Sequence, residues 1–190
     1  MYLIILGPHG AGKGTQAKLI CERYGIARIS TGDIFREHIK NNTGFGKKVK
    51  HYMDGNVYVP DKLTNVVIGV KLKQYKPKGF ILDGYPRTLD QARFLDALLV
   101  ELKIKIDAVI NLHVNKEELV KRLVNRGKKE GRTDDTEEGI RSRMNEYETK
   151  AEPVIGYYRK KGKVADISGD QPIDKVFKGI KQVLDKLIGK

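Results

Sequence analysis

The stretch YLIILGPHGAGKGT, residues 2–15, decides the fold of this chain. Its apolar run, residues 2–6, predicts a short buried strand that ends at Gly7-Pro8. The residues that follow, KGTQAKLICERYG, predict a helix closed by Gly25. A glycine-rich turn between a buried strand and a helix lets successive backbone N–H groups point inward, and the helix adds its positive dipole end. The stretch therefore predicts a site for phosphate groups.

The spacing of the glycines and the lysine in this turn matches the P-loop, a phosphate-binding motif. Four residues separate the first glycine from Gly12, and Lys13 follows, where its ammonium group can reach the terminal phosphates of a nucleotide. A side chain at Gly10 or Gly12 is expected to crowd out the ligand. The hydroxyl of the general motif comes one residue late, at Thr15, because Gly14 takes its usual place. An ordinary glycine-rich turn is the alternative, but the strand–turn–helix context favours a nucleotide loop.

Strand-like and helix-like segments alternate along the rest of the chain. Further strands are expected at 79–86, 107–114 and 163–168, and helices at 33–40, 88–102, 116–127 and 172–188. A long helix is expected to restart near Asp134 and Glu137 and to be interrupted near Pro153. This alternation predicts an α/β fold with a parallel sheet and helices on both faces. Two segments, about 30–59 and 126–134, are expected to be insertions.

The composition limits the class of protein. The chain has 190 residues, which suits one compact α/β domain with small insertions. Its net charge of +13 favours polyanionic partners, but the lysines are scattered, so a solvated surface is the simpler interpretation. The single cysteine, Cys21, excludes an intramolecular disulfide and a multi-cysteine zinc site, and fits a reducing compartment. Neither a secretory signal nor a membrane-spanning run is recognisable, so a cytoplasmic location is expected.

Further charged residues fall where phosphoryl transfer needs them. Asp83 ends a predicted buried strand, at the edge of the sheet where ligands bind, and can hold Mg²⁺ through water; a turn aspartate is the alternative. Arg87 follows Pro86, which fixes the loop, and a forked guanidinium suits phosphate. More arginines lie on or between the next two helices: Arg122, Arg126, Arg132, Arg141 and Arg143. A phosphoryl group in transfer carries spread negative charge, so this cluster favours phosphoryl transfer over simple nucleotide binding.

Five motifs together resemble the adenylate kinases, in the right order and at the right spacing. They are GPHGAGKGTQ (7–16), STGDIFR (30–36), LDGYPRTLDQA (82–92), GRTDDTEE (131–138) and EPVIGYY (152–158). The resemblance covers nearly the whole chain. It implies a three-layer α/β/α P-loop core with a five-stranded parallel sheet, made of residues 1–29, 60–125 and 135–190. It also implies an AMP-binding domain at 30–59 and a short LID at 126–134, without the zinc of some relatives.

The resemblance implies the reaction Mg·ATP + AMP ⇌ 2 ADP, by direct in-line transfer without a covalent enzyme intermediate. The phosphates of ATP would be held by Gly10, Ala11, Gly12, Lys13, Gly14 and Thr15, and its adenine would lie near Gln171. Asp83 would orient the waters of Mg²⁺. Arg36 and Arg87 would bind the AMP phosphate, and Arg122, Arg126, Arg132 and Arg143 would surround the transferred group. The AMP pocket would be formed by Thr31, Val57, Tyr58, Val59, Gly84, Tyr85, Pro86 and Gln91.

Two residues depart from the family pattern. His9 stands where the family has a second proline, and we expect it to face solvent, although its protonation below about pH 6.5 would add charge beside phosphate. Tyr58 stands where the family has leucine, which puts a larger, aromatic side chain at the AMP pocket.

Two other functions compete with this assignment. A UMP/CMP-type or broad nucleoside monophosphate kinase would share most of these residues, although such enzymes usually have alanine in place of Thr31. A non-catalytic P-loop protein that binds RNA through its positive surface would not need Asp83, Arg87 and the later arginines together. The partners implied are therefore ATP, AMP and ADP, with no obligate nucleic acid. The resemblance favours a monomer, with a homotrimer as the alternative.

Overall fold

The fold is a five-stranded parallel sheet between two layers of helices, in a computed structural model that describes residues 1–55, 57–130 and 136–189. The strands are β1 (Tyr2–Leu6), β2 (Ala27–Ser30), β3 (Phe80–Asp83), β4 (Ala108–His113) and β5 (Val164–Ser168). They are arranged in the order β2-β3-β1-β4-β5, and every pairing is parallel. The expected fold class is confirmed.

The central strands are apolar on both sides because helices cover both faces of the sheet. Ile4 of β1 joins a core with β3 and the helices α4 (Asp61–Tyr75), α5 (Leu89–Glu101) and α7 (Glu137–Arg159). The next residue, Ile5, joins a second core with α1 (Lys13–Tyr24) and α8 (Ile173–Leu187). Both isoleucines have 0% exposure. This explains why YLIIL is a continuous apolar run rather than an alternating one.

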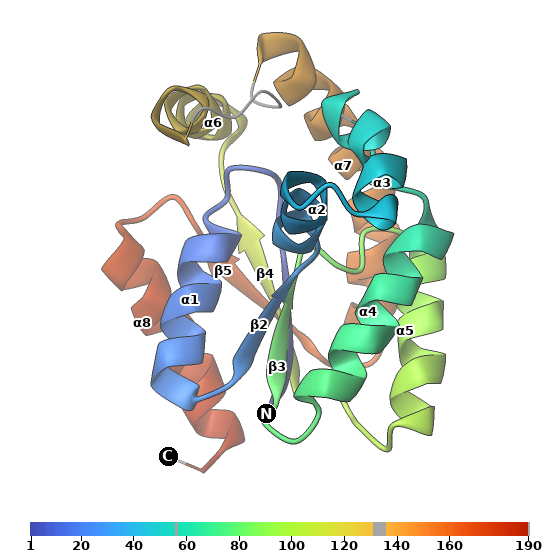
Figure 1. The fold of residues 1–190 in the computed structure, drawn as a ribbon. Coiled ribbons are helices and arrows are strands. Elements are labelled where there is room, and N and C mark those ends of the chain that lie inside the picture. The colour runs from blue at the N-terminus through green and yellow to red at the C-terminus, as the bar shows by residue number, and fades with distance from the viewer. Residues whose placement is uncertain (56, 131–135, 190) are drawn as a thin grey trace.

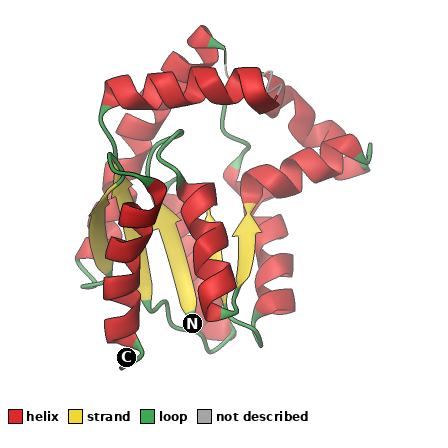
Figure 2. Ribbon diagram, turned by 90° about the vertical axis from the view of Figure 1, so that its left-hand side faces the viewer, coloured by secondary structure: helices red, strands yellow, loops and turns green. Residues whose placement is uncertain are grey.

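The remaining helices lie beyond the carboxyl ends of the strands. They are α2 (Thr31–Lys40), α3 (Gly44–Asp54) and α6 (Lys116–Glu130), and the start of α7 joins them there. The strand arrows that are visible in Figures 1 and 2 point toward these helices, whereas α1, α4, α5 and α8 flank the sheet. Within the described ranges, no helix is both long and apolar enough to cross a membrane.

Two predicted helix ends are wrong. Gly127 does not close its helix, because α6 continues with helical backbone to Glu130; a glycine inside a helix costs only about 1 kcal/mol. Pro153 does not interrupt α7, which runs unbroken through it. The lost backbone hydrogen bond at this proline is offset by burial on either side, since Ala151 and Val154 both pack into the core.

Candidate functional site

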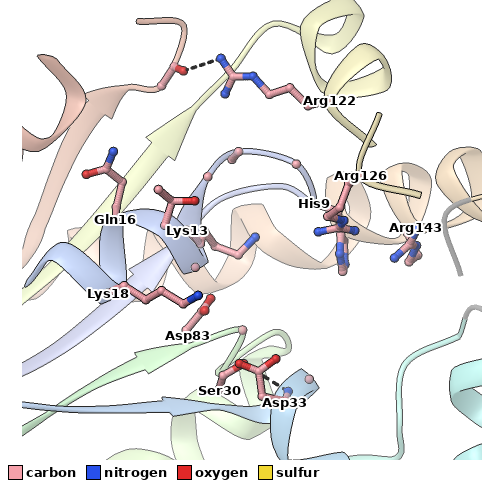
Figure 3. A pocket seen from close by; sticks show the side chains of 18 of the residues that line it. His9, Lys13, Gln16, Lys18, Ser30, Asp33, Asp83, Arg122, Arg126 and Arg143 are labelled. Atoms are coloured by element: carbon pink, nitrogen blue, oxygen red, sulfur yellow. Dashed lines mark hydrogen bonds between the residues drawn. The ribbon is translucent and has the colours of Figure 1, made fainter. Parts of the chain in front are cut away.

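A large cavity opens where the strands end and the helices α2, α3, α6 and α7 begin. Its volume is about 820 Å³. The cations that line it are Lys13, Lys18, Arg28, Arg36, Arg87, Arg122, Arg126 and Arg143. The carboxylates among its described lining residues are Asp33 and Asp83. Figure 3 shows the labelled lysine, arginine and aspartate side chains around the glycine-rich loop. The excess of positive charge suits a ligand that carries several negative charges.

The glycine-rich loop lies on this cavity and leads directly into α1. Gly10, Ala11, Gly12, Lys13, Gly14 and Thr15 all line it, as expected. Gly12 occupies the N-cap position of α1 and offers no side-chain cap, so the first turn of the helix is left for a ligand. The ammonium group of Lys13 donates to the carbonyl oxygens of Gly7 and Pro8, each at 2.8 Å. These bonds fold the Lys13 side chain back over the glycine-rich loop.

The glycines of the loop are also required by contacts and backbone angles within the protein itself. A Cβ atom at Gly10 would lie 3.0 Å from Cγ of Leu123, so it would crowd α6. A Cβ atom at Gly12 would meet nothing within 4 Å, but its φ of +88° is strained for other residues. A Cβ atom at Gly14 would lie 3.1 Å from Nη2 of Arg28, a side chain that the sequence did not single out.

His9 faces the cavity rather than solvent, so the expectation for this residue is wrong. It lines the cavity, and Figure 3 places it near Arg126. Burial and the positive charges of Arg87, Lys13, Arg143 and Arg126 lower its pKa well below the usual value. The ring is therefore neutral at pH 7 before a ligand binds, and it adds no charge of its own.

The same surroundings act on Lys13. Burial lowers its pKa to about 8, against the opposing attraction of Asp83 and with further lowering by Arg87, Arg126 and Arg143. Phosphate groups beside this ammonium group would favour its charged form and raise the pKa again. The ligand and the proton therefore bind together at this residue.

This linkage predicts proton uptake when ATP binds. At pH 8.5, a lysine with a pKa of about 8 is mostly neutral, so binding should take up roughly three-quarters of a proton. At pH 7, Lys13 is already charged and its uptake should fall to about a tenth of a proton. Calorimetric titration in two buffers of different ionisation enthalpy measures this number. Equal proton uptake in the Lys13→Met variant would contradict the assignment to this residue.

Asp83 lies at the carboxyl end of β3, as expected, and its carboxylate belongs to an ion-pair chain. Oδ2 accepts from Nη2 of Arg28 at 2.6 Å and from Nε at 3.1 Å. Nη1 of the same guanidinium donates to Oδ2 of Asp33 at 2.6 Å, and Asp33 also pairs with Arg36. The chain thus runs from the end of β3 to α2 along the floor of the cavity.

Asp83 fits the expected role toward Mg²⁺. Its carboxylate offers hard oxygen ligands, and one carboxylate together with substrate phosphates is a usual set for this ion. It is buried and lies at the cavity beside the glycine-rich loop. In the described part of the chain, no group of three or more His, Cys, Asp or Glu side chains is arranged to hold a metal ion.

A second group of residues forms the wall near α2. Gly84 follows β3 with a φ of +79°, and its carbonyl accepts from Nε of Arg87 at 2.8 Å and from the Thr31 hydroxyl at 3.0 Å. The guanidinium of Arg87 also stacks 4.7 Å from the centre of the Tyr58 ring. Ser30 caps α2 by accepting from the backbone N–H of Asp33. These contacts fix Arg87 at the cavity.

Some of the expected AMP-pocket residues line the cavity and others lie behind it. Arg36, Val57, Tyr58, Val59 and Gly84 line it, whereas Thr31, Tyr85, Pro86 and Gln91 do not. Gln91 is 2% exposed; its Oε1 accepts from the backbone N–H of Arg87 at 2.7 Å, and its Nε2 donates to Asp61 at 2.7 Å. In this conformation Gln91 positions Arg87.

The later arginines reach the cavity from two helices that follow β4 in the chain. Arg122 and Arg126 come from α6 and Arg143 from α7, as Figure 3 shows. Arg122 is held by Glu118 at 2.7 Å and by the carbonyl of Gly169 at 3.1 Å. Gln171 also lines the cavity. Arg132 lies outside the described residues, and Arg141 is exposed and does not line the cavity.

Lys18, Arg28 and Asp33 were missed as site residues. Lys18 lies one turn after the loop on α1, so the helical period alone could have placed it beside the phosphates. Arg28 is a charge in a short strand that ends at the ligand-binding edge, which is the signal that could have identified it.

Comparisons with known proteins agree with this geometry. The family model described as Adenylate kinase matches residues 5–163. A protein named Adenylate kinase from Leifsonia xyli subsp. xyli is 49% identical over 175 residues, which is 92% of this chain and 88% of that protein. Another of that name from Archaeoglobus fulgidus is 45% identical over 215 residues, covering 98% of this chain and 99% of its own length. With its phosphate loop, Asp83 and arginines on one cavity, this chain belongs to the adenylate kinase family.

Proposed function

We propose that this chain catalyses the reversible, Mg²⁺-dependent transfer of the terminal phosphoryl group of ATP to AMP, which gives two ADP. As a family member the chain is a phosphotransferase. The observation that carries the proposal is one cavity that combines the glycine-rich loop, a buried carboxylate and arginines from β2, α2, the segment after β3, α6 and α7. Since ATP and AMP bring negative charge to the same place, both need such a lining.

The donor phosphates lie on the glycine-rich loop in this proposal. The N–H groups at the start of α1 and the ammonium group of Lys13 bind the β- and γ-phosphates. To do so, Lys13 exchanges its bonds to Gly7 and Pro8 for phosphate oxygens. Gln171 lines the same cavity, and its backbone would contact the adenine of ATP.

The acceptor lies against the wall formed by α2 and the segment after β3. Arg36 and Arg87 bind the AMP phosphate, and the segment 57–59 with Thr31 and Gln91 surrounds the base. The Thr31 hydroxyl donates to Gly84 and the Gln91 amide to Asp61, and each side chain keeps a further hydrogen-bonding position for the base. The AMP phosphate oxygen is already anionic, so no general base is required.

Charge neutralisation and alignment supply the chemistry. Asp83 would hold Mg²⁺ through water, and the ion would supply positive charge that offsets the negative charge of the phosphates. Arg122, Arg126 and Arg143 surround the phosphoryl group in transfer, and Arg132 belongs to the same set. Arg143 is 5% exposed, and its Nε donates to the Gly139 carbonyl, so its guanidinium is held in place before a substrate arrives.

Two segments are proposed to close over the substrates: 30–59 as the AMP-binding domain and 126–134 as the LID, with 1–29, 60–125 and 135–190 as the core. Closure would exclude the water that otherwise hydrolyses ATP. A monomer is proposed as the working unit, with a homotrimer as the alternative. The single cysteine fits a cytoplasmic location.

The decisive experiment measures phosphoryl transfer from Mg·ATP to AMP, CMP, UMP and GMP, with the nucleotides separated by chromatography. We expect a strong preference for AMP with ADP as the sole product. Comparable transfer to CMP or UMP would assign the broader monophosphate kinase activity instead. No transfer to any acceptor would overturn the proposal.

A further inference from the structure

One guanidinium bridges both carboxylates of the described cavity lining. Arg28 donates two hydrogen bonds to Asp83 and a third, at 2.6 Å, to Asp33. Asp83 is 6% exposed, so its negative charge needs a positive partner close by. That partner is Arg28, whose Nε and Nη2 both donate to Oδ2 of Asp83.

Arg28 is held firmly under the phosphate loop. It belongs to β2, next to β3, which carries Asp83, and its side chain is 22% exposed. Gly14 approaches from the loop so closely that a Cβ atom there would lie 3.1 Å from Nη2 of Arg28 and 3.6 Å from Oδ2 of Asp83. The guanidinium therefore lies against both the donor loop and the carboxylate, and a hydrated cation at Asp83 would compete with it for Oδ2.

The other end of the bridge reaches the acceptor side. Asp33 has Arg36 as a second partner, and Arg36 is the arginine assigned to the AMP phosphate. Although burial opposes it, the hydrogen bond from Arg36 and the charges of Arg28 and Arg36 lower the pKa of Asp33. Asp33 thus stays ionised and is shared by two cations.

We propose that Arg28 pairs with Asp83 until Mg·ATP binds there, and that it thereby couples the binding of Mg·ATP to the binding of the AMP phosphate. When Mg·ATP binds at Asp83, Arg28 loses this ion-pair partner and pairs with Asp33 alone. Asp33 then holds Arg36 less tightly, and Arg36 becomes free to bind the AMP phosphate. Arg28 is a positioning residue in this scheme, and the scheme rests on the roles of Asp83 and Arg36 in the proposed function.

Two binding ratios test the proposal, both measured by calorimetry with β,γ-imido-ATP, which does not transfer its phosphoryl group. The first ratio is the gain in affinity for this nucleotide when Mg²⁺ is added. The second is the gain in affinity for AMP when Mg·β,γ-imido-ATP saturates the donor site. In Arg28→Gln, Asp83 has no competing cation, so the first ratio should rise about three- to tenfold. The second ratio should fall several-fold toward one, because Asp33 no longer changes partners.

Arg28→Lys separates charge from geometry and covers the case in which Arg28→Gln does not fold. A lysine keeps the positive charge that competes with Mg²⁺ for Asp83, but it lacks the planar guanidinium that bridges the two carboxylates. We expect its first ratio to stay near that of the unmodified protein and its second ratio to fall. Arg159→Gln is the matched control, because Arg159 also pairs with an aspartate, Asp166, but does not line the cavity. Unmodified values of both ratios in the Arg28 variants would overturn the proposal.

Asp83→Asn distinguishes this failure from a failure of the proposed function. If Asp83 holds Mg²⁺, this variant should lose most of the gain in affinity for β,γ-imido-ATP that Mg²⁺ gives. If it keeps the full metal gain, the metal assignment in the proposed function is wrong, and the inference falls with it. A large loss in Asp83→Asn together with unchanged Arg28 variants would remove the inference alone.

Discussion

Replacement of Lys13 by methionine is expected to lower kcat by about 10³-fold while the protein stays folded. The ammonium group is the positive charge that the structure places within the phosphate loop itself. In a cavity shielded from water, the loss of one such charge weakens the binding of the transferred group far more than it would at a surface. Steady-state kinetics in both reaction directions measure this loss.

The stability of the same variant should change little. Burial already disfavours the charged form of Lys13, and this is the main reason that its pKa is lowered. Methionine has a similar length and removes that penalty, but it leaves the carbonyls of Gly7 and Pro8 without their donor. We expect these effects to cancel to within about 1 kcal/mol. Lys178→Met, on the exposed side of α8, is the control and should retain full activity. A near-normal kcat in Lys13→Met would exclude the phosphate role.

The parts of the fold that were predictable are those set by local patterns. Continuous apolar runs identified β1 and β3, because strands covered on both faces need apolar residues at every position. β2 was less evident, since it has only four residues and one of them is Arg28. α4 was not assigned at all, because its buried positions are mixed with exposed valines such as Val66 and Val70.

The residues of the candidate site were likewise predictable only where a local sequence pattern identifies them. The phosphate loop and Asp83 were predictable, because each follows directly from a strand and the turn after it. The contact between Arg28 and Asp83 joins residues 55 positions apart, so only the pairing of β2 with β3 brings them together. The inward position of His9 and the buried amide of Gln91 likewise depend on neighbours from distant parts of the chain.

Replacement of Gly46 by alanine should have the largest effect on stability among the glycine variants. Gly46 lies on α3 where this helix crosses α2, and an added Cβ atom would overlap the carbonyl of His38 and lie 2.8 Å from the backbone N of Ile39. Backbone atoms cannot rotate away, so α3 must move as a unit. Such overpacking should lower the free energy of unfolding by about 2–3 kcal/mol.

The same substitution links packing to the acceptor site. α3 buries Val49 against the core, and the chain that follows it leads to Val57 and Val59 at the cavity. A displaced α3 should therefore raise the KM for AMP by about tenfold, or roughly 1.4 kcal/mol, while the KM for ATP changes little because the phosphate loop belongs to β1 and α1. Denaturant unfolding and steady-state kinetics measure the two effects. Gly44→Ala is the control, since a Cβ atom there meets nothing within 4 Å; it should leave AMP binding unchanged and stability equal or up to about 1 kcal/mol higher. If both alanine variants behave alike, close packing at Gly46 does not shape the acceptor site.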